Sequence, residues 1–169
     1  TRQPPWACVQ IGPPHFFLCA PITEVLEDTA HPDEFRTRIA ALVRPVGYIN
    51  TTTPNGDYFR NHLPKFSECS DPTVYEAHQF KPDSDGHIFL LHPEEIEPLG
   101  QSAGLELERF DLMTNPLTSG HMKTRFLLRA TPQAVVGQIE NLTARLPHEW
   151  RRRLSTQIVA RFRKPPAHT

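Results

Sequence analysis

Two segments of the chain share the same helix-start chemistry, and each is followed by a run of residues typical of a β-strand. Residues 31–34 read His-Pro-Asp-Glu, and residues 92–95 read His-Pro-Glu-Glu. In both, proline stands where its missing N–H costs nothing, and the two acids lie near the positive end of the helix dipole. A helix followed directly by a strand is the building unit of α/β sheets, so this order constrains the fold more than any other feature.

The first unit is predicted from a helical stripe and a β-branched run. Apolar side chains at positions 35, 39, 42 and 43 share one helix face, and Arg44-Pro45 ends the helix because a residue before proline avoids the α region. Residues 47–53 contain Tyr48, Ile49 and three threonines and lead into the turn Pro54-Asn55-Gly56. We therefore expect a helix over 33–43 and a strand over 47–53.

The second unit should end in an antiparallel strand pair. The helix that begins at Pro93 is expected to end just before Gly104, which then serves as the glycine after its last turn. Residues 105–112 alternate, with a phase slip at Arg109-Phe110 that indicates a β-bulge, and residues 122–130 alternate again. Together the two units predict an α/β fold with a mixed sheet and an antiparallel C-terminal strand pair.

Three regions follow from these patterns. Residues 1–21 contain five prolines without a period of two or 3.6, so we expect an irregular N-terminal segment. Residues 22–130 hold the α/β units, including a long irregular loop over 57–86 of the kind that often binds ligands. Residues 131–169 are expected to form one or two helices, with a break at Leu146-Pro147 and a surplus of basic side chains.

The charge balance and the cysteines bear on the class of protein. With 18 basic and 19 acidic side chains, the chain has no general attraction to nucleic acid or to an anionic membrane, and no apolar run is long enough to span one. We interpret the basic C-terminal region as a solvated helix face, with an anionic ligand as the alternative. Three cysteines at wide spacings indicate free thiols in a reducing compartment, so we expect a cytoplasmic protein.

An ordered series of short motifs between residues 22 and 130 resembles the class I S-adenosylmethionine-dependent methyltransferases. The motifs are Glu24-Val25-Leu26-Glu27-Asp28, His31-Pro32-Asp33-Glu34-Phe35, Leu42-Val43-Arg44-Pro45-Val46-Gly47, Thr53-Pro54-Asn55, Gly86-His87-Ile88-Phe89 and Ser102-Ala103-Gly104-Leu105. They are most similar to the O-methyltransferases of the ubiquinone-biosynthesis type and to relatives from polysaccharide clusters. The resemblance implies that the chain is the C-terminal part of a doubly wound, Rossmann-like sheet, with its fourth to seventh strands.

The resemblance also indicates what the chain lacks. Class I methyltransferases hold the cofactor with a glycine-rich turn after their first strand and with an acid after their second. The eight glycines form no G-x-G, and neither strand has a counterpart in the sequence. The family pattern has a second glycine where this chain has Val46, and a histidine where it has Asp28. The implied activity is O- or N-methylation of a small-molecule or saccharide acceptor with S-adenosylmethionine, incomplete in this chain.

Two other functions stay open. The chain is alternatively a non-catalytic remnant or protein-interaction domain, whose incomplete sheet edge favours self-association. A nucleic-acid-binding module on the basic C-terminus is a third hypothesis. Neither an RNP-like aromatic motif nor a helix-turn-helix pattern accompanies that charge, so we expect no nucleic-acid partner.

The resemblance assigns two groups of residues near the end of the fourth strand. Ile22, Thr23 and Glu24 correspond to residues that pass under the methionine part of the cofactor, and packing or capping by Thr23 is an equal alternative. Glu24, Glu27 and Asp28 are spaced to share one helix face, and oxygen ligands of this kind suit Mg²⁺. Related methyltransferases hold a divalent ion with the equivalent acids, while acids near a helix N-terminus are also common for dipole reasons.

The acceptor side is expected in the long loop that follows the strand at 47–53. Asn55, Tyr58 and His78 are predicted to bind the substrate, because open α/β sheets bind ligands beyond the carboxyl ends of their strands. His87 is predicted to be catalytic, as a base that takes a proton from the acceptor hydroxyl. A surface or capping role is the alternative for each histidine.

Overall fold

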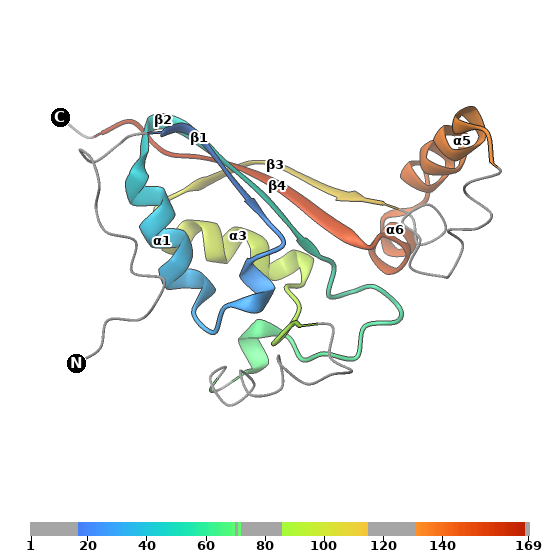
Figure 1. Ribbon diagram of the computed structural model, residues 1–169, viewed down its shortest axis with the longest axis horizontal. Helices are drawn as coiled ribbons and strands as arrows, with labels where there is room; N and C mark the ends of the chain where they lie inside the picture. Colours follow the sequence, from blue (N-terminus) through green and yellow to red (C-terminus); the bar gives the residue numbers. More distant parts are fainter. Residues whose placement is uncertain (1–16, 70, 72–85, 115–130, 168–169) are drawn as a thin grey trace.

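A four-stranded mixed sheet forms the centre of the structure (Figure 1). The computed structural model describes residues 17–69, 71, 86–114 and 131–167. The strands are β1 (Phe17–Thr23), β2 (Val43–Pro54), β3 (Glu106–Met113) and β4 (Gln157–Arg163), in the spatial order β1-β2-β4-β3. β1 and β2 are parallel, whereas β4 is antiparallel to both of its neighbours. The predicted mixed α/β fold is therefore confirmed.

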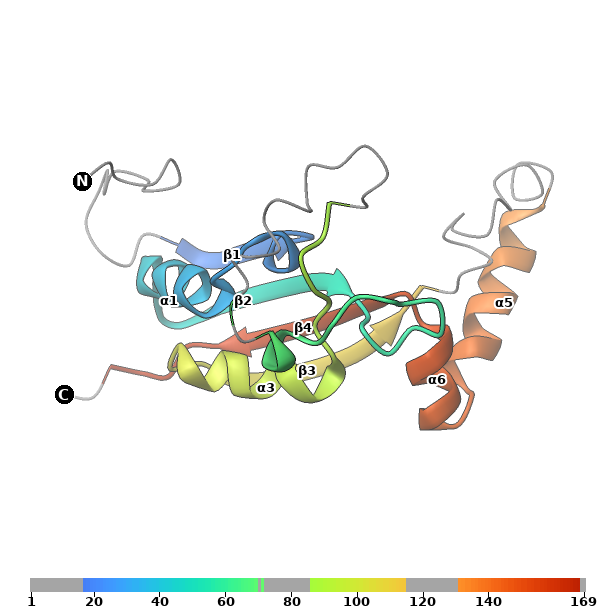
Figure 2. The same cartoon turned by 90° about the horizontal axis from the view of Figure 1, so that it is seen from below.

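Two helices pack on one face of this sheet. α1 (Pro32–Leu42) and α3 (Pro93–Ser102) lie on the same side of the strands (Figures 1 and 2). Two 3-10 turns, η1 (Leu26–Asp28) and η2 (Phe66–Glu68), lie in the connecting segments, and α5 (Gln133–Ala144) and α6 (His148–Leu154) lie beyond one end of the sheet. Of the described helices, none is long and apolar enough to cross a membrane.

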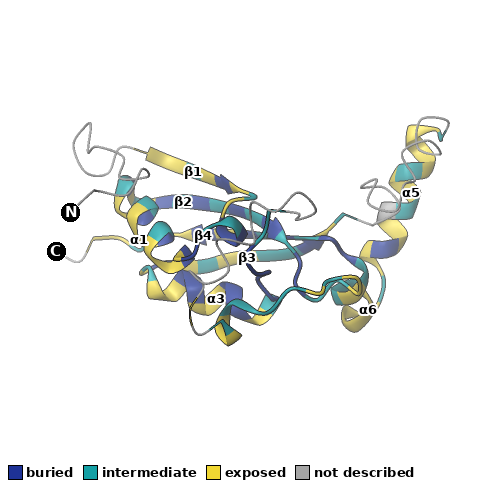
Figure 3. Cartoon of the chain, turned by 60° about the horizontal axis from the view of Figure 1, so that its bottom comes forward, coloured by how far each residue is buried: buried dark blue, intermediate teal, exposed yellow. Residues whose placement is uncertain are grey.

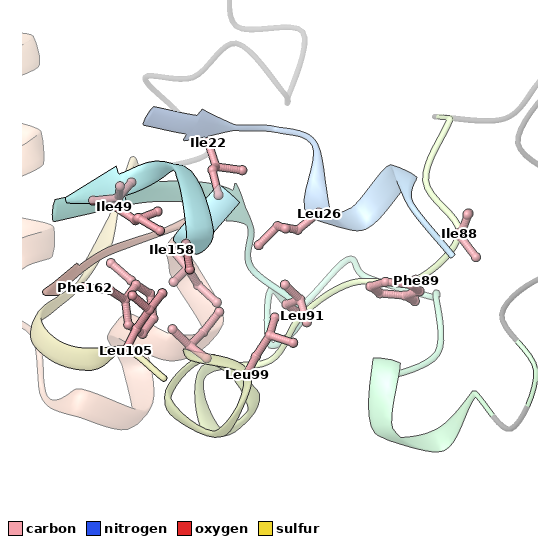
Figure 4. Close-up of a cluster of buried hydrophobic side chains, with 14 of the residues drawn as sticks. Ile22, Leu26, Ile49, Ile88, Phe89, Leu91, Leu99, Leu105, Ile158 and Phe162 are labelled. Atoms are coloured by element: carbon pink, nitrogen blue, oxygen red, sulfur yellow. The ribbon is translucent and has the colours of Figure 1, made fainter. Parts of the chain in front are cut away.

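The hydrophobic core lies between the sheet and the pair of helices α1 and α3 (Figure 4). Buried residues alternate with more exposed ones along much of β2 and β4 (Figure 3), and Ile49 and Phe162 are fully buried, so alternate residues of these strands face the core. Gly100 lets α3 approach closely, since a Cβ there would lie 2.2 Å from Cε1 of Phe162. On the opposite face, Arg161 Nε donates to Asn50 Oδ1 at 3.0 Å.

Most of the predicted elements have their expected positions. The helix expected over 33–43 is α1, and the strand expected over 47–53 is part of β2. α3 ends before Gly104, which has the left-handed conformation (φ 69°) typical of a glycine after a helix. The pairing register of β3 shifts between Leu107 and Arg109, which confirms the expected bulge.

β1 corrects the expectation of an irregular segment over 1–21, because residues 17–21 belong to a strand and residues 1–16 lie outside the described part. Pro21 is tolerated in this strand because of its position. The backbone N–H of Glu24 donates to Thr52 O at 3.0 Å, so by alternation the even-numbered residues of β1 face β2. The nitrogen of Pro21 therefore lies on the outer side, where no described strand requires its missing N–H.

The antiparallel partner of β3 also differs from the prediction. β3 pairs with β4, whose residues 157–163 lie in a region that was expected to be helical. α5 and α6 confirm the expected helices and their break at Leu146-Pro147. In β4, buried apolar residues occupy every second position, a period that the helical pattern just before it obscured. The strand expected over 122–130 lies outside the described residues.

Val46 has a backbone conformation that suits glycine. Its φ is 59°, which a β-branched residue rarely adopts. It lies in a bulge of β2, where the pairing with β1 skips from Val43 to Tyr48, and its N–H donates to Lys164 O at 3.0 Å. The sheet pairing on both sides fixes this bulge, so we infer that it holds Val46 in a strained conformation.

We expect Val46→Gly to stabilise the protein by about 1 kcal/mol, because glycine adopts a positive φ without steric cost. The greater conformational entropy of glycine in the unfolded chain offsets only part of this gain. Urea unfolding followed by circular dichroism measures the change. Val25→Gly is the matched control, since Val25 is 37% exposed, against 45% for Val46, but has a φ of −135°, and glycine should destabilise it. A Val46→Gly variant no more stable than the wild type would contradict the strain.

Candidate active site

The carboxyl ends of the parallel strands β1 and β2 bring three segments together. Because the two strands run the same way, η1 after β1 and the loop after β2 begin at the same edge of the sheet. The segment before α3 joins them through two backbone hydrogen bonds, from Ile88 N to Glu27 O at 3.0 Å and from Gly56 N to Leu91 O at 2.9 Å. This edge is where open α/β sheets bind their ligands.

Asp28 and His87 form a hydrogen-bonded pair at this edge. Nδ1 of His87 lies 2.8 Å from Oδ1 of Asp28, and the two side chains are 24% and 38% exposed, respectively. The pair joins residues that the sequence assigned to different roles, His87 to catalysis and Asp28 to a metal. A histidine with one nitrogen bound to a carboxylate has its other nitrogen left for proton transfer, which is the arrangement of a general base.

Glu27 lies beneath this pair, in the interior. Its side chain is fully buried, and Thr53 Oγ1 donates a hydrogen bond to its Oε2 at 2.8 Å. Burial raises the pKa of the Glu27 carboxyl from 4.5 to about 7; hydrogen bonds from the backbone and Thr53 oppose the rise, and the charges of Glu24 and Asp28 add to it. A carboxyl so perturbed beside a histidine pair is typical of a functional site.

The common face expected for Glu24, Glu27 and Asp28 does not form. Glu24 precedes η1 and has a left-handed backbone conformation (φ 49°), Glu27 is buried against Thr53, and Asp28 contacts His87. The segment is a single 3-10 turn, which lacks the i, i+4 geometry of an α-helix. The predicted Mg²⁺ site therefore gains no support from this geometry.

A different trio in the described part brings its ligand atoms within 4.8 Å of one another, namely Asp57, His92 and Glu94. Cations already contact its carboxylates, because Arg152 pairs with Asp57 and lies 2.7 Å from Glu94, and Lys65 lies 2.8 Å from Glu94. Burial would raise the pKa of Glu94, but its bonds with Lys65 and the backbone and the charges of Lys65 and Arg152 lower it to about 2. We interpret this cluster as a network of ion pairs that joins the loop after β2 to α3 and α6.

The predicted cofactor residues lie at the end of β1 with different exposures. Ile22 is buried in the hydrophobic core and faces the helices, so it has no surface for a cofactor. Thr23 is exposed, and Glu24 is partly buried. Thr23 and Glu24 are therefore the residues of this group that could line a ligand.

The predicted substrate residues separate into three cases. Asn55 is fully buried, and its Nδ2 donates to the carbonyls of Arg152 at 2.6 Å and Ser155 at 2.7 Å, so it joins the segment after β2 to the C-terminal end of α6. Tyr58 is partly buried, its Oη has no hydrogen-bond partner among the described residues, and burial raises its pKa although Arg60 opposes this. His78 lies outside the described residues.

Arg36 is a buried charge that the sequence patterns did not indicate. Its side chain on α1 is fully buried, its Nη2 donates to Thr51 Oγ1 at 3.1 Å, and its guanidinium lies 4.3 Å from the centre of the Phe162 ring. Burial lowers its pKa from 12.5 to about 10. The sequence feature that could have indicated its burial is its position one turn before Ala40, on the face of α1 that packs against the sheet.

Comparison with known proteins identifies the fold. No protein-family model and no curated protein matches the chain. Among solved structures, the [4+2]-cyclase SpnF is 13% identical with a TM-score of 0.53, over 94% of this chain and 53% of SpnF. A putative methyltransferase from Bacillus halodurans is 12% identical with a TM-score of 0.50, over 93% of this chain and 74% of that one. An S-adenosylmethionine-dependent methyltransferase from Mesorhizobium loti is 10% identical with a TM-score of 0.52, over 90% of this chain and 64% of that one.

These likenesses show that the chain has the Rossmann-like fold of the S-adenosylmethionine-dependent methyltransferases. The chain spans only about half of the length of SpnF, at 53%. Because the identities are low, the likeness concerns the arrangement of helices and strands and leaves the reaction to be argued from the site.

Glu27→Gln is expected to change how stability depends on pH. Because the folded state raises the carboxyl pKa from 4.5 to about 7, the stability that protonated Glu27 contributes is full below 4.5 and is lost as pH rises to about 7. That loss is about 3 kcal/mol, and the glutamine variant lacks it. Urea unfolding at both ends of this range tests the difference. Glu34→Gln, at an exposed site on α1, should keep the wild-type pH dependence of stability. If the stability of Glu27→Gln depends on pH in the same way as that of the wild type, the raised pKa of the Glu27 carboxyl is contradicted.

Proposed function

We propose that this chain is the acceptor-side part of a methyltransferase that methylates a hydroxyl or an amine of a small molecule or saccharide. The single observation that carries this is the Asp28–His87 pair at the carboxyl end of parallel strands in a methyltransferase fold. The strand directions support it, because β4 is the last strand in the sequence and is antiparallel to both of its neighbours, as the resemblance implies for the final strand of the family sheet.

The residues of this chain do not by themselves fit S-adenosylmethionine. No G-x-G occurs in the sequence, Ile22 faces the core, and in the described sheet only β1 and β2 pair in parallel. Only glycine would let the backbone approach such a cofactor closely. We therefore propose that the glycine-rich part comes from further residues, of this or another polypeptide, while Thr23 and Glu24 border it.

Among the described strands, the two edges of the sheet support an incomplete fold. β3 carries Glu106, Glu108, Arg109 and Asp111, charges of the kind that protect a solvent-exposed edge. β1 has no charged residue, and its exposed apolar side chains include Phe17 at 44% and Leu18 at 62% exposure. This asymmetry favours β1 as the edge where further parallel strands attach.

The acceptor side of the proposed site consists of His87, Tyr58 and His78. His87 would take the acceptor proton, and Tyr58 and His78 would contact the substrate. Asn55 supports the loop rather than the substrate, because its side chain is fully buried and donates to two backbone carbonyls. A divalent ion is not needed for this scheme, in which the protein groups alone handle the proton.

A second candidate is a non-catalytic interaction domain, and the uncharged edge of β1 favours it. An unprotected edge strand pairs readily with another chain, including a second copy of this one. The similar fold of the [4+2]-cyclase SpnF adds that this fold is compatible with chemistry other than methyl transfer. Analytical ultracentrifugation distinguishes an associating chain from a monomer.

The proposed activity is tested with the gene product extended upstream until it includes a glycine-rich strand and turn. Transfer of a radiolabelled methyl group to small-molecule hydroxyl acceptors is expected from this product and not from the 169-residue chain alone. His87→Gln should lower kcat by roughly 10² to 10⁴, the usual contribution of a general base. His148→Gln, an exposed histidine on α6, is the matched control. Full activity in His87→Gln would overturn the assignment of the base.

A further inference from the structure

We infer that Asp28 is a positioning residue that fixes the ring of His87 so that Nε2 faces a hydroxyl-bearing acceptor, an inference that rests on the proposed function. The contact is the 2.8 Å hydrogen bond between His87 Nδ1 and Asp28 Oδ1. The family pattern has a histidine at position 28, so this carboxylate–histidine pair is a property of this chain and not of the motif that it resembles.

Both partners of the pair are mounted on rigid segments. Their neighbours Glu27 and Ile88 are joined by the backbone bond from Ile88 N to Glu27 O at 3.0 Å, which holds the segments side by side. Leu26 before them and Phe89 after them are fully buried in the core (Figure 4). Because the buried neighbours fix both backbones, the pair is preorganised before any ligand binds.

The carboxylate dictates where the imidazole carries its hydrogen. An ionised carboxylate accepts hydrogen bonds and cannot donate one, so a neutral His87 must carry its hydrogen on Nδ1. Its lone pair is then on Nε2, at the opposite side of the ring. The proton of an acceptor hydroxyl passes to Nε2, and the resulting imidazolium charge lies 2.8 Å from the carboxylate.

This arrangement favours a hydroxyl over an amine as the acceptor group. A neutral amine already presents a lone pair and gains little from a base, whereas a neutral hydroxyl becomes a strong nucleophile only as its proton leaves. An oriented base is therefore most useful for O-methylation. His87 occupies Oδ1 of Asp28 in this arrangement, so a metal ion would have to bind Oδ2 of Asp28 or displace the ring.

The experiment measures the ring tautomer of His87 directly, in the 169-residue chain with ¹⁵N-labelled histidine. Spectra are recorded at about pH 8.5, where an ordinary imidazole is neutral. The wild type should show the Nδ1–H form. Asp28→Ala removes the acceptor and should shift the ring largely to Nε2–H, the form that an unrestrained imidazole prefers, whereas Asp28→Glu should keep Nδ1–H. Asp33→Ala, at an exposed acid on α1, is the matched control and should leave the tautomer unchanged.

An Nε2–H ring in the wild type, or an unchanged ring in Asp28→Ala, would overturn the inference. If Asp28→Ala fails to fold, the wild-type tautomer and a titration with millimolar Mg²⁺ still decide. A His87 signal unaffected by Mg²⁺ supports the pair, and a displaced signal supports the metal site instead. The tautomer measurement does not depend on methyl transfer, so the two proposals can fail separately. If the ring of His87 is Nδ1–H but the extended protein transfers no methyl group, the proposed function is refuted and the positioning by Asp28 stands.

Discussion

The pairing of β2 on both of its sides is the constraint on which the rest of the structure depends. Its parallel pairing with β1 brings two carboxyl ends to one edge, and its antiparallel pairing with β4 closes the C-terminal part of the sheet. Its inward face carries Ile49 into the core and Thr51 and Thr53 beneath the site, where they bond Arg36 and Glu27. The site thus lies at the end of a strand that is paired on both sides.

The elements that the sequence predicted were those specified by neighbouring residues. The proline and acids at the start of α1, and Gly104 after α3, act through local geometry, so their patterns predicted the structure correctly. β4 was missed because its place between β2 and β3 depends on long-range pairing. Pro21 misled the prediction of β1, since proline is harmless on an outer strand edge and only the topology shows which edge is outer.

The site was predictable in composition and not in its pairings. The sequence indicated His87 and the acids that follow β1, but the Asp28–His87 bond joins residues 59 positions apart and required the fold. Asn55 looked like a loop residue at a ligand-binding edge, yet the return of the chain before β4 buries its amide against two carbonyls. The general rule is that residue type indicates possible chemistry, while non-local contacts decide which groups remain exposed to perform it.

We propose that this chain carries the acceptor-side edge of a methyltransferase sheet and lacks the turn that holds the cofactor. Isothermal titration calorimetry with S-adenosylmethionine tests it most directly, on the 169-residue chain and on the same chain extended by a glycine-rich strand and turn. The account predicts saturable micromolar binding by the extended protein and no saturable heat from the chain alone. Saturable micromolar binding by the chain alone would contradict it.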